Sequence, residues 1–137
     1  MNLFVDTSMF FAAVDAGDER HADARRVLGS EDSLVTSDHV LAETWSLIDL
    51  RLGCAAAEGF WAGVREGSVE IEDVVPADLE VAWSIGEAFP DQRFSLTDRT
   101  SFAVMLRLGI HRAASLDKDF AVFRFGRRRD RSFEIFR

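Results

Sequence analysis

Acidic residues stand at four positions from which a sheet-based fold could bring them together: Asp6, Glu43, Asp98 and Asp117. Asp6 follows the apolar run 3–5, Asp98 begins an apolar segment typical of a helix, and Asp117 follows a second short apolar run. In open α/β sheets, ligands bind at the carboxyl ends of the strands. Carboxylates that crowd there raise one another's pKa, and a divalent cation relieves the repulsion. The acids therefore predict a metal site with room for a phosphate.

The oxygen ligands also indicate which metal to expect. The chain has one cysteine, Cys54, and three scattered histidines, so neither an internal disulfide nor a zinc site of the usual spacing is expected. Carboxylate oxygens select Mg²⁺ or Mn²⁺, and Mg²⁺ typically takes one or two carboxylates directly and keeps waters. We therefore expect Mg²⁺ or Mn²⁺ as the cofactor.

Each acid also has a structural interpretation that needs no ligand. Asp6 could cap the following helix, and Asp98 could be a first-turn acid that favours the helix dipole. Asp117 could begin a turn of helix through residue 120, with Asp119 exposed on that turn. The functional interpretation depends on several of these residues meeting at one edge of the sheet.

Glu43 is the most telling acid in the pattern. It shares a predicted helix face with Val40, Leu47 and Leu50, where an apolar residue would be typical. Burial of a lone carboxylate there would cost several kcal/mol, so Glu43 should meet a cation, a donor cluster or a metal. A salt bridge or a wet groove remains the alternative.

Strands alternate with helices along the whole chain. Strands are expected at 3–5, 34–35, 69–74, 112–116 and 133–136, with 69–74 at an edge because its apolar residues alternate. Helices are expected from residue 9 to near 17, and at 19–28, 40–52, 55–65, 76–89 and 97–108. This order predicts one α/β domain over residues 1–137, with a mostly parallel central sheet flanked by helices on both faces.

The length, charge and hydrophobicity of the chain indicate where in the cell to expect it. The chain has 137 residues and a formal charge of −8, and it has no apolar run near the roughly 20 residues of a membrane span. The N-terminus lacks the basic flank of a signal peptide. We expect a cytoplasmic protein without membrane contact.

In order and spacing, these residues resemble the PIN-domain ribonucleases, and most closely the VapC-like toxins of toxin–antitoxin pairs. The resemblance covers essentially the full chain, and its most specific motif is the last one. The residues that carry it are Asp6-Thr7-Ser8, Glu43, Thr97-Asp98 and Ser115-Leu116-Asp117-Lys118-Asp119-Phe120.

The resemblance implies roles for these residues. Asp6, Glu43, Asp98 and Asp117 match the family's acidic quartet. The supporting hydroxyl positions are matched by Ser8 and by Ser115, which stands where threonine is common, and Asp119 is an additional ligand or a supporting acid. Membership implies a Mg²⁺- or Mn²⁺-dependent endoribonuclease that hydrolyses RNA with metal-activated water. It also implies a homodimer and a cognate antitoxin that holds the enzyme inactive.

Two further features concern partners. The last part of the chain is rich in arginine and phenylalanine, and its arginines could contact RNA, contact a partner's acids or simply be solvated. The first half has aromatic residues in its helices that are either core or an apolar groove for a partner's helix, which an antitoxin could use. These are Phe10, Phe11, Trp45, Phe60 and Trp61.

Two other functions remain open at this point. A haloacid-dehalogenase-like Mg²⁺ phosphohydrolase also begins with a strand that ends in Asp, but it normally has a second Asp two residues later, where this chain has Ser8. A non-catalytic interaction domain that keeps the fold is the alternative outside enzymes. Motifs for a serine nucleophile, a phosphate loop or a dinucleotide are absent from the sequence.

Overall fold

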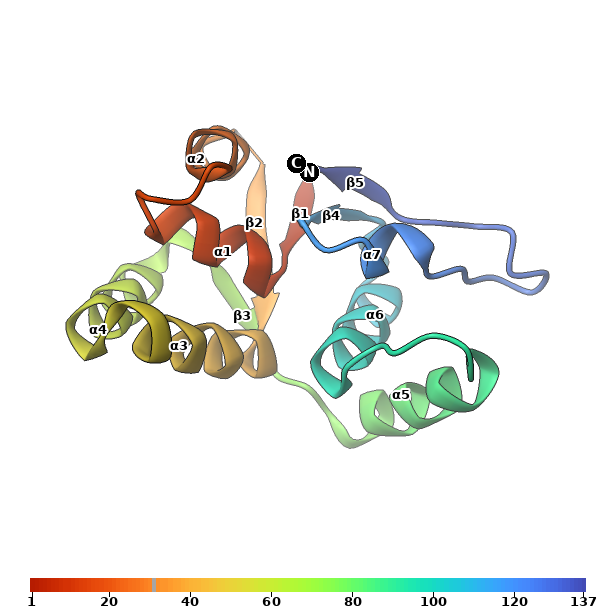
Figure 1. Cartoon of the computed structure of the whole chain (residues 1–137). Coiled ribbons are helices and arrows are strands. Elements are labelled where there is room, and N and C mark those ends of the chain that lie inside the picture. Colours follow the sequence, from red (N-terminus) through yellow and green to blue (C-terminus); the bar gives the residue numbers. More distant parts are fainter. Residues whose placement is uncertain (31) are drawn as a thin grey trace.

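A five-stranded parallel sheet organises the chain, which is described over residues 1–30 and 32–137 by a computed structural model. Its strands are β1 (Asn2–Val5), β2 (Ser33–Ser37), β3 (Glu70–Glu72), β4 (Arg112–Ala114) and β5 (Glu134–Phe136). Their order is β3-β2-β1-β4-β5 (Figure 1). Phe4 in the central strand pairs with Val35 on one side and Ala113 on the other. β3 lies at an edge, as its alternating sequence predicts.

Helices connect successive strands. They are α1 (Thr7–Val14), α2 (His21–Leu28), α3 (Asp38–Leu52), α4 (Cys54–Gly63), α5 (Pro76–Ala88), α6 (Leu96–Leu108) and α7 (Asp119–Val122). A π-helical turn, η1 (Val64–Ser68), follows α4 and includes Gly67 at a φ of 89°. The predicted helix 55–65 therefore ends in a wider turn than expected. No helix among the described residues is both long and apolar enough to cross a bilayer.

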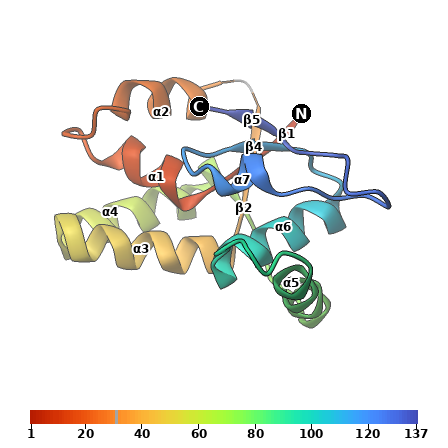
Figure 2. The same cartoon turned by 45° about the vertical axis from the view of Figure 1, so that its right-hand side comes forward.

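The helices cover both faces of the sheet. The chain moves from β1 through β2 to β3 in one direction and from β3 past β1 to β4 and β5 in the other. Because parallel crossovers are right-handed, the two halves place their helices on opposite faces. Figure 1 shows α1–α4 on its left and α5–α7 on its right, and in Figure 2 the start of α3 lies next to the start of α6, where the two helices are in contact. The predicted single α/β domain with a parallel sheet is confirmed.

The core lies between the sheet and its helices. Phe4 of β1, Phe102 of α6 and Phe120 of α7 are fully buried. The Phe102 ring stacks on Phe123 at a centroid distance of 4.3 Å and meets Phe120 edge-on at 4.9 Å. This aromatic packing fixes α6 and α7 against each other.

Aromatic residues of the first half divide between core and surface. Phe10 and Phe11 are buried, and half-buried Phe60 packs against Phe10 at 5.3 Å. Trp45 and Trp61 instead line an apolar groove on α3 and α4, where 44% of Trp61 is exposed. Both predicted alternatives therefore occur, the core for three residues and a groove for two.

Candidate metal-binding site

The site lies at the carboxyl ends of the central strands. Asp6 follows β1, and its backbone N–H donates to the carbonyl of Ala114 at the end of β4 (3.0 Å). The connections from these two strands leave in opposite directions, which makes this edge the switch point of the sheet. The fold therefore places Asp6 where α/β proteins usually bind ligands.

Two serine hydroxyls hold the carboxylate of Asp6. Ser8 Oγ donates to Asp6 Oδ2 at 2.8 Å, and Ser115 Oγ donates to the same oxygen at 3.0 Å. The backbone N–H groups of Leu116 and Asp117 donate to these two hydroxyls in turn (2.9 and 3.0 Å). Asp6 is the N-cap residue of α1, but its side chain makes no capping hydrogen bond. Burial raises the pKa of Asp6, and the hydrogen bonds from the two serines oppose that shift.

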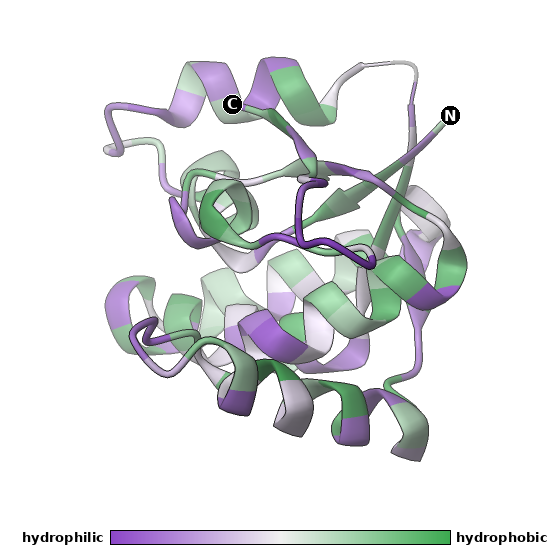
Figure 3. Ribbon diagram, turned by 90° about the vertical axis from the view of Figure 1, so that its right-hand side faces the viewer, coloured by the Kyte–Doolittle hydropathy of each residue, from purple (hydrophilic) through white to green (hydrophobic). Residues whose placement is uncertain are grey.

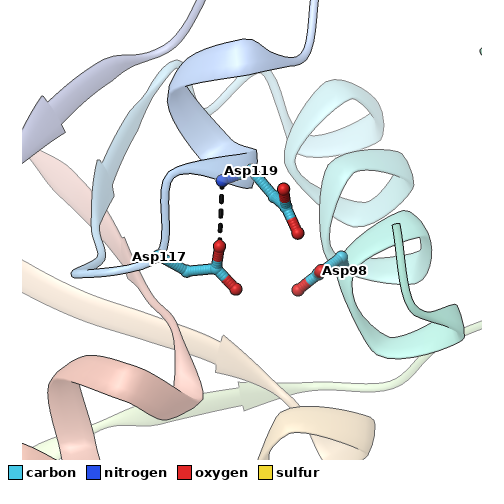
Figure 4. A group of neighbouring side chains, drawn as sticks. All are labelled: Asp98, Asp117 and Asp119. Carbon is cyan, nitrogen blue, oxygen red and sulfur yellow. Dashed lines mark hydrogen bonds between the residues drawn. The ribbon is translucent and has the colours of Figure 1, made fainter. Parts of the chain in front are cut away.

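Three further carboxylates converge beside Asp6. Asp98, Asp117 and Asp119 each place one oxygen within 4.8 Å of the other two (Figure 4). Asp98 lies in the first turn of α6, where Ser95 Oγ caps the helix by accepting from the Asp98 N–H at 3.0 Å. Asp119 N–H donates to Asp117 Oδ1 at 2.9 Å, which fixes the loop between β4 and α7.

The electrostatics of the group oppose full ionisation. Burial and the charges of Asp6, Asp117 and Asp119 raise the pKa of Asp98 to about 7. Desolvation and the charge of Asp117 also raise the pKa of Asp119. Among residues 1–30 and 32–137, no lysine or arginine forms an ion pair with Asp6 or with these three acids. Lys118 acts on Asp119 electrostatically and lowers its pKa, but it forms no ion pair with it, so no ion pair in the described chain offsets the charge of the group.

Glu43 differs from the expectation of a buried acid. It is exposed on α3, where Thr7 Oγ1 donates to its Oε2 at 3.2 Å. The predicted apolar face holds only in part: Val40 is fully buried and Leu47 is half-buried, but 82% of Leu50 is exposed. Because Glu43 is exposed, it needs no cation to offset burial. Its hydrogen bond with Thr7, the residue after Asp6, connects it to the edge of the sheet that carries the acids.

The donor set fits a hard divalent cation. Three carboxylate oxygens close enough to share an ion, without cysteine or histidine ligands in the group, match the preference of Mg²⁺ and Mn²⁺ for oxygen. Burial and the neighbouring carboxylates disfavour the charged form of Asp98 and raise its pKa. A bound cation would remove that penalty.

The sequence left the role of Asp119 open and did not single out Ser95. Asp119 was predicted to be an additional ligand or a supporting acid, with an exposed acid as the alternative, and its carboxylate lies within 4.8 Å of those of Asp98 and Asp117. The signal for Asp119 was its spacing of two residues from Asp117. An aspartate side chain commonly accepts a hydrogen bond from the backbone N–H two residues later, and this bond holds Asp119 near Asp117. Ser95 was not singled out, although Ser at three residues before an acid is a common helix-start pattern.

Comparison with known proteins defines the class. The PIN domain family model matches residues 3–126. The chain belongs to the PIN-domain family, within its VapC-type ribonuclease toxins. This assignment confirms the sequence-based resemblance and favours it over a haloacid-dehalogenase-like enzyme.

Two curated relatives come from Mycobacterium tuberculosis. The 23S rRNA-specific endonuclease VapC20 is 42% identical over 125 residues, which cover 90% of this chain and 95% of the relative. Ribonuclease VapC26 is 28% identical over 117 residues, or 85% of this chain and 87% of the relative. The chain thus aligns with nearly the full length of two ribonucleases.

Solved structures agree with the fold. The crystal structure of M. tuberculosis VapC20, described as a Sarcin-Ricin loop cleaving toxin, superposes with a TM-score of 0.83 at 39% identity, covering 88% of this chain and 93% of that one. VapBC2 from Rickettsia felis, solved with a DNA fragment from its promoter, gives a TM-score of 0.67 at 11% identity over 89% and 92% of the two chains. The second likeness concerns the fold alone.

Proposed function

We propose that this protein is a Mg²⁺- or Mn²⁺-dependent endoribonuclease whose ion is held by Asp98, Asp117 and Asp119, with Asp6 beside them. The observation that carries the proposal is the group of three converging carboxylates that forms no ion pair with a lysine or arginine among the described residues. Family membership supplies the reaction class, hydrolysis of RNA phosphodiester bonds.

The bound ion would polarise the scissile phosphate. It would also lower the pKa of a bound water molecule, so that hydroxide is available at neutral pH. The residues of this chain keep the donors in place. Ser8 and Ser115 fix the orientation of Asp6, and the Asp119 N–H fixes that of Asp117. Ser95 sets the first turn of α6 and so the position of Asp98. In this proposal Glu43, through Thr7, lies at the margin of the site and contacts solvent or substrate.

The relatives suggest which RNA to test first. VapC20 is named as specific for 23S rRNA, and its structure is described as that of a Sarcin-Ricin loop cleaving toxin. We therefore propose ribosomal RNA as the substrate class of this chain. Such a substrate agrees with the predicted cytoplasmic location.

As a VapC-type toxin, the protein should be held inactive by a cognate antitoxin. The apolar groove that Trp45 and Trp61 line with Leu41 and Ala42 is the surface that we propose for an apolar segment of this partner. The family resemblance also implies a homodimer, which light scattering on the purified protein would test.

The experiment is cleavage of purified 23S rRNA by the wild-type protein and two variants. With Mn²⁺ or Mg²⁺ we expect discrete cuts that EDTA abolishes. Asp98→Asn should lower the rate by about two orders of magnitude or more at unchanged folding, because it removes a proposed ligand. The matched control Asp49→Asn changes an exposed acid on α3 and should cleave like the wild type. Equal activity of wild type and Asp98→Asn would overturn the proposed site, and a wild type that cleaves no RNA would favour the non-catalytic alternative.

A further inference from the structure

An arginine-rich hairpin follows α7. Residues 124–131 include five arginines and one aspartate, in a chain whose formal charge is −8. None of these arginines forms an ion pair within residues 1–30 and 32–137. Arg127 and Arg128 are exposed at its tip. The hairpin is therefore a local excess of positive charge on an acidic protein.

The hairpin is built as a defined structure. Phe125 and Arg131 exchange two backbone hydrogen bonds (2.9 and 3.2 Å), which close the loop between them. Phe125 is buried and packs on Phe133 at a centroid distance of 4.9 Å. The base of the hairpin is thus anchored in the aromatic core, while its tip extends from the domain (Figure 1) and is strongly hydrophilic in Figure 3.

Other arginines of the hairpin shape its surface. Arg129 adopts a left-handed φ of 51°, and its guanidinium lies 5.3 Å from the centroid of Phe89. Arg124 Nη1 donates to the carbonyls of Ala121, Val122 and Phe123, so it caps α7. Together with Phe89, Arg124 and Arg129 line an open groove between the hairpin and α5. Aromatic rings and guanidinium planes are surfaces on which unpaired bases stack.

The hairpin is close to the acidic site along the chain. Asp119 begins α7, whose four residues cover about 6 Å, and the hairpin follows directly after it. Even a fully extended chain would place Arg128 within roughly 25 Å of Asp119. Phe102, one turn after Asp98 on α6, stacks on Phe123 beside Arg124, so the same packing holds both surfaces.

We propose that this arginine hairpin is a second RNA-binding surface, which holds the phosphate backbone of the strand that extends from the acidic site. The inference deepens the proposed ribonuclease function and rests on it. A polyanion is repelled by a protein with a net charge of −8, so productive binding needs a local positive surface beside the reactive edge. The short chain distance to the acidic site and the packing that α6 and Phe123 share favour RNA over an acidic protein as the occupant. Arg127 and Arg128, the exposed tip residues, would contact phosphates.

The test compares two double variants with equal charge. Arg127→Gln/Arg128→Gln changes the tip, and Arg25→Gln/Arg65→Gln changes two exposed arginines on α2 and η1 that form no ion pair in the described chain. Each removes two positive charges, so both shift the net charge from −8 to −10. Binding of a fluorescein-labelled oligouridylate of about 20 nucleotides in EDTA is followed by anisotropy at several salt concentrations, and cleavage of 23S rRNA gives kcat and KM.

We expect the tip variant to bind the oligouridylate about tenfold more weakly than the control variant, with a salt slope smaller by about 1.4 because two phosphate contacts are lost. Its KM should rise while kcat stays near the wild-type value. Equal affinity and KM for the two variants would overturn the hairpin inference, and so would a tip variant that loses binding only to polyglutamate, a probe for acidic proteins. If the hairpin inference fails but the wild type cleaves RNA, the proposed ribonuclease function stands. If the wild type neither binds nor cleaves RNA, both proposals fail.

Discussion

Asp98 combines two opposing requirements at one residue. Only 8% of the residue is exposed, and its carboxylate faces three other acids, so its charged form is disfavoured. The same neighbours make it a good ligand once a cation is present. The carboxylate of Asp98 should therefore lower the stability of the metal-free protein at neutral pH and at the same time be needed for metal binding.

The first expectation concerns pH and the metal-free protein. The pKa of Asp98 is raised from 3.8 to about 7 on folding, so between these values the native state binds more protons than the unfolded state. The contribution of Asp98 to the free energy of unfolding is therefore lost as pH rises from about 4 to about 7, and the raised pKa values of Asp6 and Asp119 act in the same direction.

Thermal unfolding in EDTA measures this effect. Asp98→Asn carries no titrating group at that position, so its Tm relative to wild type should increase between about pH 5 and about pH 8. Added Mn²⁺ should raise the wild-type Tm at the upper pH and leave that of Asp98→Asn nearly unchanged. A Tm difference between the two proteins that does not vary with pH would contradict the raised pKa of Asp98.

The second expectation concerns Ser115, which is fully buried and bonds both Asp6 and the Asp117 N–H. Ser115→Ala leaves that N–H and one carboxylate contact unpaired, so the free energy of unfolding should fall by about 1–3 kcal/mol. Ser115→Thr keeps the hydroxyl and is the matched control. Urea denaturation of the two variants gives the comparison, and an alanine variant as stable as wild type would contradict the role of this hydroxyl.

How much of the site could be predicted differs from residue to residue. Asp6 directly follows β1, Asp98 lies in the first turn of α6, and Asp117 lies three residues after β4, and these positions follow from apolar runs that are visible in the sequence. Glu43 was placed on the wrong face of α3, because the buried face is formed by Val40, Thr44 and Ile48 and its middle residue is polar. The nearness of Asp119 depends on one backbone hydrogen bond, which spacing allows but does not require.

At the scale of elements, α6 links the site to the rest of the fold. Ser95 fixes its first turn, Phe102 packs its middle, and Gly109 ends it at a left-handed φ of 69°. Near its last turn, Arg107 forms a bidentate ion pair with buried Asp78 of α5 (3.0 Å for both contacts). This pair holds the two helices together on the side away from the carboxylates.

The third expectation tests that pair. Asp78→Asn leaves the Arg107 guanidinium without its anion and weakens the acceptor for the Val75 N–H. Since Asp78 is buried, the free energy of unfolding should fall by about 3 kcal/mol, whereas exposed Glu87→Gln on the same helix should change it little.

Cleavage by the folded Asp78→Asn protein should stay within severalfold of wild type, because Asp98 lies nine residues from Arg107, about 13 Å along α6. Chemical denaturation and cleavage below the unfolding transition measure the two effects separately. A stable variant that has lost cleavage would mean that the pair positions the site rather than the helices.

The elements themselves were predictable from local sequence. Apolar runs located the strands, and glycine or proline marked most helix ends, such as Gly53 after α3 and Pro76 at the start of α5. The π-helical turn after α4 was not predictable, because it depends on Gly67 taking a left-handed conformation within an otherwise helical segment. The order of the strands was not predicted, because local patterns do not determine which strands pair.

At the scale of the whole molecule, opposite charges come from neighbouring segments of the chain. The carboxylates gather at the switch point of the sheet, and the arginine hairpin extends from the helix that begins with Asp119. An acidic protein could in this way bind a divalent cation and a polyanion side by side. The proposed RNA contact and the proposed metal site are thus parts of one arrangement.

The central claim is that Asp98, Asp117 and Asp119 share a divalent cation, and anomalous diffraction from crystals soaked in Mn²⁺ tests it most directly. The account predicts an anomalous peak within bonding distance of carboxylate oxygens from these three residues, and no such peak in Asp98→Asn crystals soaked in the same way. Ordered, separated carboxylates with no peak between them, or Mn²⁺ bound only at other acids, would contradict it.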